Sequence, residues 1–237
     1  MLYFFSDKIV LHIAHARPLQ EQDLPHYYEI LEHLSQKAGV ATPRLYLCPD
    51  PQPNAFSVGR DPNHASIAVT RGFVESIEPE EVEGVFAHEL AHIVHSETLG
   101  GSITTVLAGI FTYFAQNGHF SITANTEDKT MGNNISALFF LFLSPIASAI
   151  IRFVKNDKAE IMADFQGATL TRNPQALVQA LETMQSAVDH GIGLILPNPS
   201  IAHLFIVHPF QTETLRKLFD SQISFDIRLD KLRNMIV

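Results

Sequence analysis

Two histidines and a glutamate stand at fixed spacing in the pentapeptide H-E-L-A-H, residues 88–92. A helix is predicted here on independent grounds. Pro79 suits a first helical turn, acidic residues follow it near the positive end, and apolar residues then recur at helical spacing. Four residues make about one helical turn, so His88 and His92 project from the same face about 6 Å apart along the axis. The fold must therefore present both imidazoles on one face of a largely buried helix.

The chemistry typical of this spacing is metal binding and hydrolysis. One zinc ion can sit between two imidazoles, because zinc–nitrogen bonds are about 2.0–2.1 Å long. Glu89 lies beside the first histidine, where its carboxylate can reach a zinc-bound water without binding the metal. The pattern predicts a zinc peptidase with His88 and His92 as ligands and Glu89 as the general base. The alternative is that these are ordinary core or surface histidines.

A catalytic zinc takes a third protein ligand and keeps one position open. His95 shares the helix face, but it lies about 10 Å along the axis from His88, too far for one ion on a straight helix. The metzincin pattern is excluded, because it requires Gly at 95 and His at 98, where this chain has His95 and Thr98. A carboxylate from a second helix remains. Glu160 in K-A-E-I-M-A-D is the best candidate, and Asp164, one turn later, could accept a hydrogen bond from a ligating histidine. Spacing alone does not decide which of the two binds the metal.

Two long stretches without Asp, Glu, Lys or Arg follow the histidine helix, at residues 98–118 and 131–151. Each is long enough for a helix of roughly 20 residues to cross a bilayer. The second is rich in Leu, Phe and Ile, whereas threonines and glycines make the first marginal. The alternative is a pair of buried helices in a soluble protein.

The zinc ligands impose a topological condition on these stretches. His88 and Glu160 flank them and must meet at one ion, so either both stretches cross a membrane or neither does. We expect both to cross, as a hydrophobic helical hairpin over residues 98–152 inserted into a single peptidase domain, residues 1–237. Basic residues lie just past the hairpin, while its loop carries only Lys129, and this asymmetry places the catalytic side toward the cytoplasm.

The remaining pattern predicts an α+β fold that is mainly helical. Three short segments, punctuated by Pro and Asn clusters, indicate a small antiparallel sheet. The expected strands are 44–48, 55–58 and 65–70. Besides the histidine helix, the expected helices are 24–38, 160–168, 174–188 and 212–218.

Composition excludes several classes of protein. The formal net charge is −9, with 16 basic against 25 acidic residues, which argues against a nucleic-acid partner. The lone cysteine, Cys48, excludes an internal disulfide and a multi-cysteine zinc site, and it fits a reducing compartment. The N-terminus lacks a basic region ahead of a long apolar core, so we do not expect a secretory signal.

An ordered set of motifs along nearly the whole chain resembles the HtpX family of membrane-bound zinc proteases, relatives of the CAAX prenyl endopeptidases. The set comprises Y-F-F-S-D-K-I-V, P-N-A-F-S-V-G-R, A-S-I-A-V-T, H-E-L-A-H, two apolar segments, E-I-M-A-D and a late His-Pro. The resemblance implies a gluzincin-type domain with one Zn²⁺ per chain, Glu160 as the third ligand and Asp164 as the partner of a ligating histidine. It also implies a bacterial inner-membrane protease with a cytoplasmic active site, acting on unfolded or membrane proteins in quality control and in contact with the lipid bilayer.

The sequence departs from the family pattern at three places. Family members usually begin with two further membrane spans ahead of the position of Met1, so we expect this sequence to be either a truncation or a short variant. Asn-Asp at 156–157 replaces a Ser-Arg pair. His208 is preceded by Val207 and followed by Pro-Phe rather than two prolines. Two roles for His208 stay open: a hydrogen bond to the transition-state oxyanion, or an ordinary structural histidine.

The substrate is expected to bind extended along the edge of the small sheet, beside Asn54, Ala55 and Phe56. Asn54 could equally be a simple turn residue after a proline. Backbone pairing reads little side-chain identity, so the prediction is broad specificity.

Two other functions remain for the same residues. One is a catalytically silent zinc protein, a membrane scaffold, although such a protein would not need Glu89. The other is a prenyl-protein processing endopeptidase, with the same chemistry on a lipidated substrate.

Overall fold

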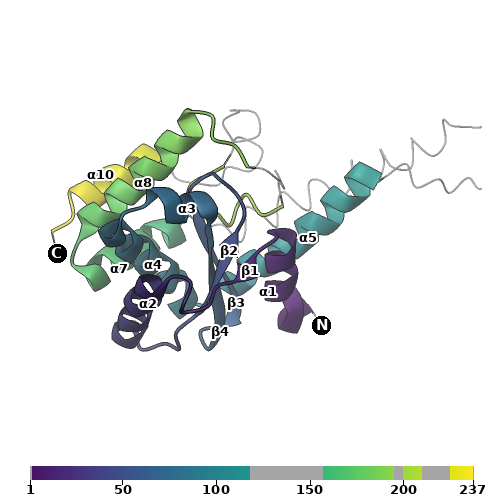
Figure 1. Ribbon diagram of the computed structural model, residues 1–237, viewed down its shortest axis with the longest axis horizontal. Coiled ribbons are helices and arrows are strands. Elements are labelled where there is room, and N and C mark those ends of the chain that lie inside the picture. Colours follow the sequence, from purple (N-terminus) through teal and green to yellow (C-terminus); the bar gives the residue numbers. More distant parts are fainter. Residues whose placement is uncertain (1, 118–156, 195–199, 210–224, 237) are drawn as a thin grey trace, which may run out of the picture.

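The computed structural model describes residues 2–117, 157–194, 200–209 and 225–236 (Figure 1). Four strands form one sheet: β1 (Arg17–Pro18), β2 (Arg44–Cys48), β3 (Ala55–Asp61) and β4 (His64–Thr70). Helices surround it: α1 (Leu2–Ile13), α2 (Pro25–Ala38), α3 (Arg71–Ser76), α4 (Pro79–Val94), α5 (Thr98–Asn117), α7 (Asp157–Thr171), α8 (Pro174–Asp189) and α10 (Phe225–Arg233). The mainly helical α+β class is confirmed.

The sheet is mixed, so the predicted antiparallel sheet is wrong. Its order is β1-β2-β4-β3, with β2 parallel to β4 and the pairs β1–β2 and β3–β4 antiparallel. The reason lies in the connection 49–54, where three prolines that cannot donate ladder hydrogen bonds carry the chain past the place of β4. A tight turn after β3 then returns the chain, and β4 fills the space between β2 and β3. As a result, β3 is an edge strand.

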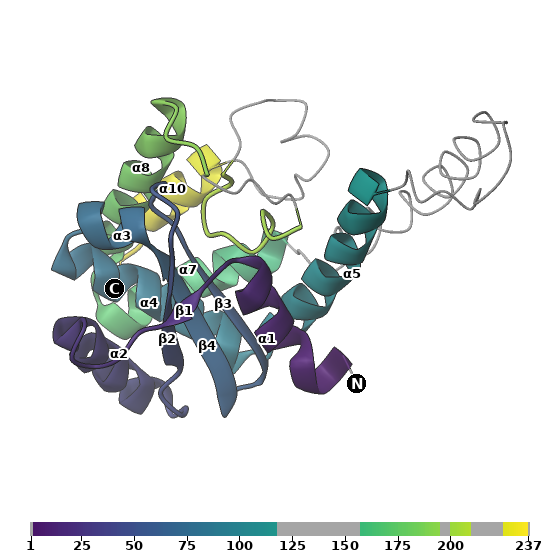
Figure 2. The ribbon, with the colours of Figure 1, turned by 45° about the vertical axis from the view of Figure 1, so that its right-hand side comes forward.

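The sheet is buried on both faces, with a separate apolar core on each. In both views α2, α4, α7, α8 and α10 lie on one side of the sheet and α1 and α5 on the other (Figures 1 and 2). Because successive strand residues point to opposite faces, Ile67 and Val69 join the first core, whereas Ala68 joins the second. The helices on both sides of the sheet therefore pack against it through apolar side chains.

Helix α4 begins where the sequence predicts. Pro79 occupies its first turn, and Glu78 and Glu81 form a reciprocal capping box, in which the Glu78 N–H donates to Glu81 Oε2 at 3.1 Å. Two glycines mark its closest packing. A Cβ at Gly84 would lie 2.8 Å from the backbone nitrogen of Leu177 in α8, and one at Gly167 of α7 would lie 2.9 Å from the backbone nitrogen of His88. Helix α4 therefore touches both neighbours almost backbone to backbone.

The first uncharged stretch forms α5, which packs beside α1 and the edge strand β3. Among the helices of the described segments, none is long and apolar enough to cross a bilayer. The second stretch, 131–151, and the helix expected at 212–218 lie outside the described residues. The inserted hairpin therefore stays a prediction.

Candidate metal centre

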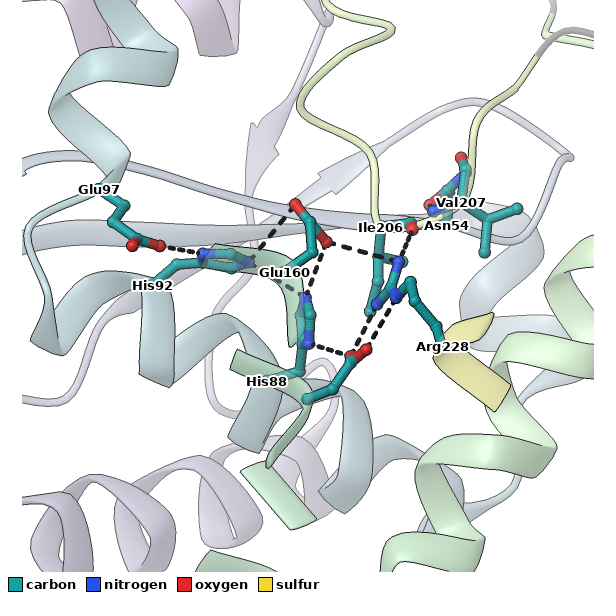
Figure 3. A network of polar contacts seen from close by, with 9 residues as sticks. Asn54, His88, His92, Glu97, Glu160, Ile206, Val207 and Arg228 are labelled. Atoms are coloured by element: carbon teal, nitrogen blue, oxygen red, sulfur yellow. Dashed lines mark hydrogen bonds and ion pairs between the residues drawn. The ribbon is translucent and has the colours of Figure 1, made fainter. Parts of the chain in front are cut away.

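The histidine face of α4 meets α7 across the packing at Gly167. His88 Nε2 and His92 Nε2 lie 3.1 Å apart, and the Glu160 carboxylate lies 3.8 Å from His88 Nε2 and 3.9 Å from His92 Nε2 (Figure 3). One ligand atom from each of the three residues lies within 4.8 Å of the others. Tetrahedral zinc with bonds near 2.1 Å would space its ligand atoms by about 3.4 Å. The three side chains therefore surround a space of the right size for one such ion.

The tautomers of the two histidines test whether a cation fits. His88 Nδ1 lies 2.9 Å from Asp164 Oδ1, and His92 Nδ1 lies 2.7 Å from Glu97 Oε2. A carboxylate partner holds the proton on each Nδ1, so each Nε2 presents a lone pair. Two ring nitrogens at 3.1 Å must share a cation, either a proton in an N–H···N hydrogen bond or a metal ion that replaces it. The donor set of two imidazoles and a carboxylate thus fits a divalent metal of the zinc type.

Asp164 is the most strongly tied carboxylate of the site. Its exposed fraction is 3%, and Arg228 donates to it twice, from Nε to Oδ2 at 2.8 Å and from Nη2 to Oδ1 at 2.7 Å. Burial alone would raise the pKa of Asp164, but the Arg228 guanidinium and the His88 imidazole hold that pKa far below its ordinary value. Asp164 is therefore an ion in the native protein and can orient His88.

The surroundings of His92 are strongly anionic. Burial lowers the pKa of its imidazole, but the hydrogen bond that the ring donates to Glu97 and the charges of Glu160 and Glu89 outweigh burial and raise the pKa to about 9. The same field that favours a proton on this ring also attracts a divalent cation.

A cavity opens beside the cluster. It is lined by Ser57, Glu89, His92, Glu97, Thr98, Gly101, Ala159, Glu160, His203 and Leu204. Glu89 is 2% exposed, so its carboxylate reaches water mainly through this cavity. Glu89 therefore shares one cavity with His92 and Glu160.

The comparisons with known proteins bear on this centre. The model of Peptidase family M48 matches residues 21–221. The chain belongs to peptidase family M48. It is 37% identical over 238 residues to a protease HtpX homolog of Syntrophobacter fumaroxidans, a match that covers 98% of this chain and 84% of that protein. A protease HtpX homolog of Pyrococcus furiosus is 37% identical over 235 residues, covering 98% and 81%.

A solved structure supports the fold of this M48 peptidase. The crystal structure of S. mikatae Ste24p matches with a TM-score of 0.51 at 16% identity, and the match covers 97% of this chain and 57% of the Ste24p chain. The predictions of the HtpX family and of a metalloprotease are thereby confirmed, and a peptidase acts on polypeptides.

The residues predicted to lie beside the substrate are buried in this M48 peptidase. Asn54, Ala55 and Phe56 are each 0% exposed. The Asn54 side chain donates from Nδ2 to the Val207 carbonyl at 2.7 Å and accepts from the Val207 N–H at 3.3 Å (Figure 3). The side chain of Asn54 thus ties the segment 206–209 to the start of β3.

His95 and His208 are not among the described residues that line the cavity beside the cluster, whereas His203 is. His208 is 8% exposed. His95 ends α4, where its Nε2 lies 2.7 Å from Gln166 Oε1. The structural or surface role expected for His95 agrees with this position.

Three residues of this M48 peptidase site escaped the sequence reasoning: Ser57, Glu97 and Arg228. Glu97 lies five residues after His92, so a carboxylate just past the motif was a usable signal. Arg228 lies in α10, 64 residues after Asp164, and no sequence pattern indicates that two residues so far apart are in contact.

Proposed function

We propose that this chain is a zinc-dependent endopeptidase that holds one Zn²⁺ with His88, His92 and Glu160. One observation carries the proposal. The Nε2 atoms of two imidazoles face each other at 3.1 Å beside a carboxylate, and the group adjoins a cavity lined by Glu89. A purely structural zinc site does not need that further carboxylate, which argues against a silent scaffold.

Three carboxylates of this chain have separate roles in the proposed hydrolysis. Zinc, when bound, supplies a Lewis acid that activates water and polarises a carbonyl. Glu89 takes the proton of the attacking water as general base and then delivers it to the leaving amine. Asp164 and Glu97 hold the Nδ1 protons of His88 and His92, so that both Nε2 atoms stay directed at the metal.

The substrate backbone is proposed to pair with the edge strand β3 at Ser57. The Ile206 N–H donates to the Ala55 carbonyl at 3.1 Å, and the Gly59 N–H donates to Ser102 Oγ at 3.4 Å. Backbone groups of alternate residues point to the same edge, so those of Ser57 point there too. Ser57 also lines the cavity. This favours Ser57 over Asn54 as the pairing position, and main-chain pairing suits unfolded or loosely folded substrates.

The setting is proposed from the family resemblance. We place the protein in the bacterial inner membrane, with the hairpin 98–152 inserted into one peptidase domain, 1–237, and the active site toward the cytoplasm. Its substrates there would be unfolded or membrane proteins in quality control. His208 is retained as a candidate for binding the oxyanion.

The test is hydrolysis of casein by the full chain with zinc, beside Glu89→Gln and a chelated sample, with bound zinc counted in each. We expect the Glu89→Gln protein to keep one zinc and lose turnover. Turnover retained by Glu89→Gln would refute the general-base role. Zinc bound without turnover in either protein would favour a scaffold, and cleavage of a prenylated peptide but not casein would favour a prenyl-protein processing enzyme.

A further inference from the structure

Arg228 is the buried cation of the metal centre. It lies in α10, is 3% exposed, and contacts both α7 and the segment 200–209 (Figure 3). Besides its two hydrogen bonds to Asp164, its Nη1 donates to the Ile206 carbonyl at 3.0 Å and lies 3.4 Å from Glu160 Oε2. One guanidinium therefore contacts both carboxylates that α7 directs toward the histidines.

The geometry of these contacts is specific to arginine. The planar guanidinium presents donors in a fixed fork, which matches the two oxygens of Asp164 and leaves Nη1 for the other acceptors. Asp164 Oδ1 then accepts from Arg228 on one side and lies 2.9 Å from His88 Nδ1 on the other. A buried ion pair that served only to join two helices would not need to contact both the carboxylate proposed to bind the metal and the carboxylate that faces His88 Nδ1.

We propose that Arg228 is a positioning residue of the metal centre: it fixes the carboxylates of Asp164 and Glu160, so that α10 sets how tightly the metal is held. The inference rests on the proposed function, since it assumes that Glu160 and His88 bind zinc. Holding Asp164 fixes the ring of His88, and holding one oxygen of Glu160 leaves the other directed at the ion.

Arg228 acts through these residues and not on the substrate. It is not among the described residues that line the catalytic cavity. Its loss should therefore weaken metal binding and lower kcat, while KM changes little. A residue that merely stabilised the fold would not separate these quantities.

The experiment measures zinc affinity by competition with a chromophoric chelator, using the full chain and the variants Arg228→Met and Arg228→Lys. Arg233→Met is the matched control, because Arg233 lies on the same helix and pairs with Glu182 away from the metal centre. Loss of a partner behind a metal ligand typically costs about 10- to 100-fold in affinity. Circular dichroism and thermal unfolding show whether each variant is folded.

We expect Arg228→Met to bind zinc about 10- to 100-fold more weakly. Arg228→Lys should be intermediate, since one ammonium cannot reproduce the fork, and Arg233→Met should match the wild type. Equal zinc affinity in folded Arg228→Met and wild type would overturn the proposal, as would an equal loss in Arg233→Met. If Arg228→Met does not fold, the zinc affinity of Arg228→Lys tests the proposal, and an affinity equal to that of the wild type would overturn it. A wild-type chain that binds no zinc would instead refute the proposed function.

Discussion

Gly167 lies where α7, the helix of Glu160 and Asp164, packs against the backbone of His88. A Cβ at this position would lie 2.9 Å from the His88 nitrogen and 3.1 Å from the His88 Cα. Comfortable non-bonded contacts between such atoms are about 3.5–4.0 Å. Because the opposing atoms are backbone, no side-chain rotation can relieve the clash. Gly167→Ala must therefore move α7 away from α4 by roughly 0.5–1 Å.

The expected cost is small for stability and large for activity. Replacing Gly by Ala inside a helix contributes about 0.5–1 kcal/mol of stability, whereas overpacking a core typically costs about 1–3 kcal/mol. The free energy of unfolding should thus fall by roughly 0.5–2 kcal/mol. The same shift carries Glu160 and Asp164 away from the histidines, and a misplacement of about 1 Å in an active site can cost on the order of 100-fold in rate.

Urea unfolding and casein hydrolysis at saturating zinc measure the two effects separately. Gly193→Ala is the control, because no atom of the described residues lies within 4 Å of a Cβ there and the backbone is not in the left-handed region. We expect it to behave as the wild type in both assays. Gly167→Ala with unchanged turnover would refute the view that the interhelical distance at His88 sets the catalytic geometry.

Three further predictions follow from buried groups. Burial would raise the pKa of Asp164, but Arg228 holds this pKa far below the unfolded value of about 3.9. The ionised Asp164 therefore stabilises the native state above about pH 3.9, and this stabilisation is lost progressively as the pH falls below that value. Guanidinium unfolding of the chelated protein between pH 6 and 3 should show this loss, and Asp164→Asn should show a weaker slope; an equal slope would contradict it. Burial, with a smaller contribution from a nearby carboxylate, raises the pKa of Cys48 to about 12, so a thiol reagent at pH 8 should label it only in denaturant, and rapid native labelling would be inconsistent. Asn54→Ala leaves the Val207 carbonyl without its buried donor and should cost about 1–3 kcal/mol in urea unfolding, whereas a change below about 0.5 kcal/mol would count against this role.

Local features of this fold were predictable because they depend on neighbours in sequence. Pro79 and the acidic residues after it set the start of α4, and the strand at 44–48 has the predicted bounds. Glu160 and Asp164 were expected on one helix face, since they stand one turn apart. In the structure they do face the histidines, one toward Nε2 and the other toward Nδ1 of His88.

Features that depend on distant pairing were not predictable. Strand periodicity identifies a strand but not its neighbour, and a six-residue connection after Cys48 suits an adjacent strand as well as one that skips a place. No helix was predicted at α1, α3 or α10, and with α10 the contact of Arg228 was missed as well. The burial of the Asn54 side chain was not predicted for the same reason, because its hydrogen-bond partner Val207 is 153 residues away.

The near backbone-to-backbone packing of α4 has a consequence for protein engineering. Grafting H-E-L-A-H and a distant glutamate onto another helical scaffold would reproduce the ligands but not their spacing, because Gly84 and Gly167 set how near the neighbouring helices can come. The smallest transplantable unit is therefore the pair α4–α7 with its glycine contact, joined by a third helix that supplies an arginine. A designer should select scaffolds by helix separation first and choose the ligand positions afterwards.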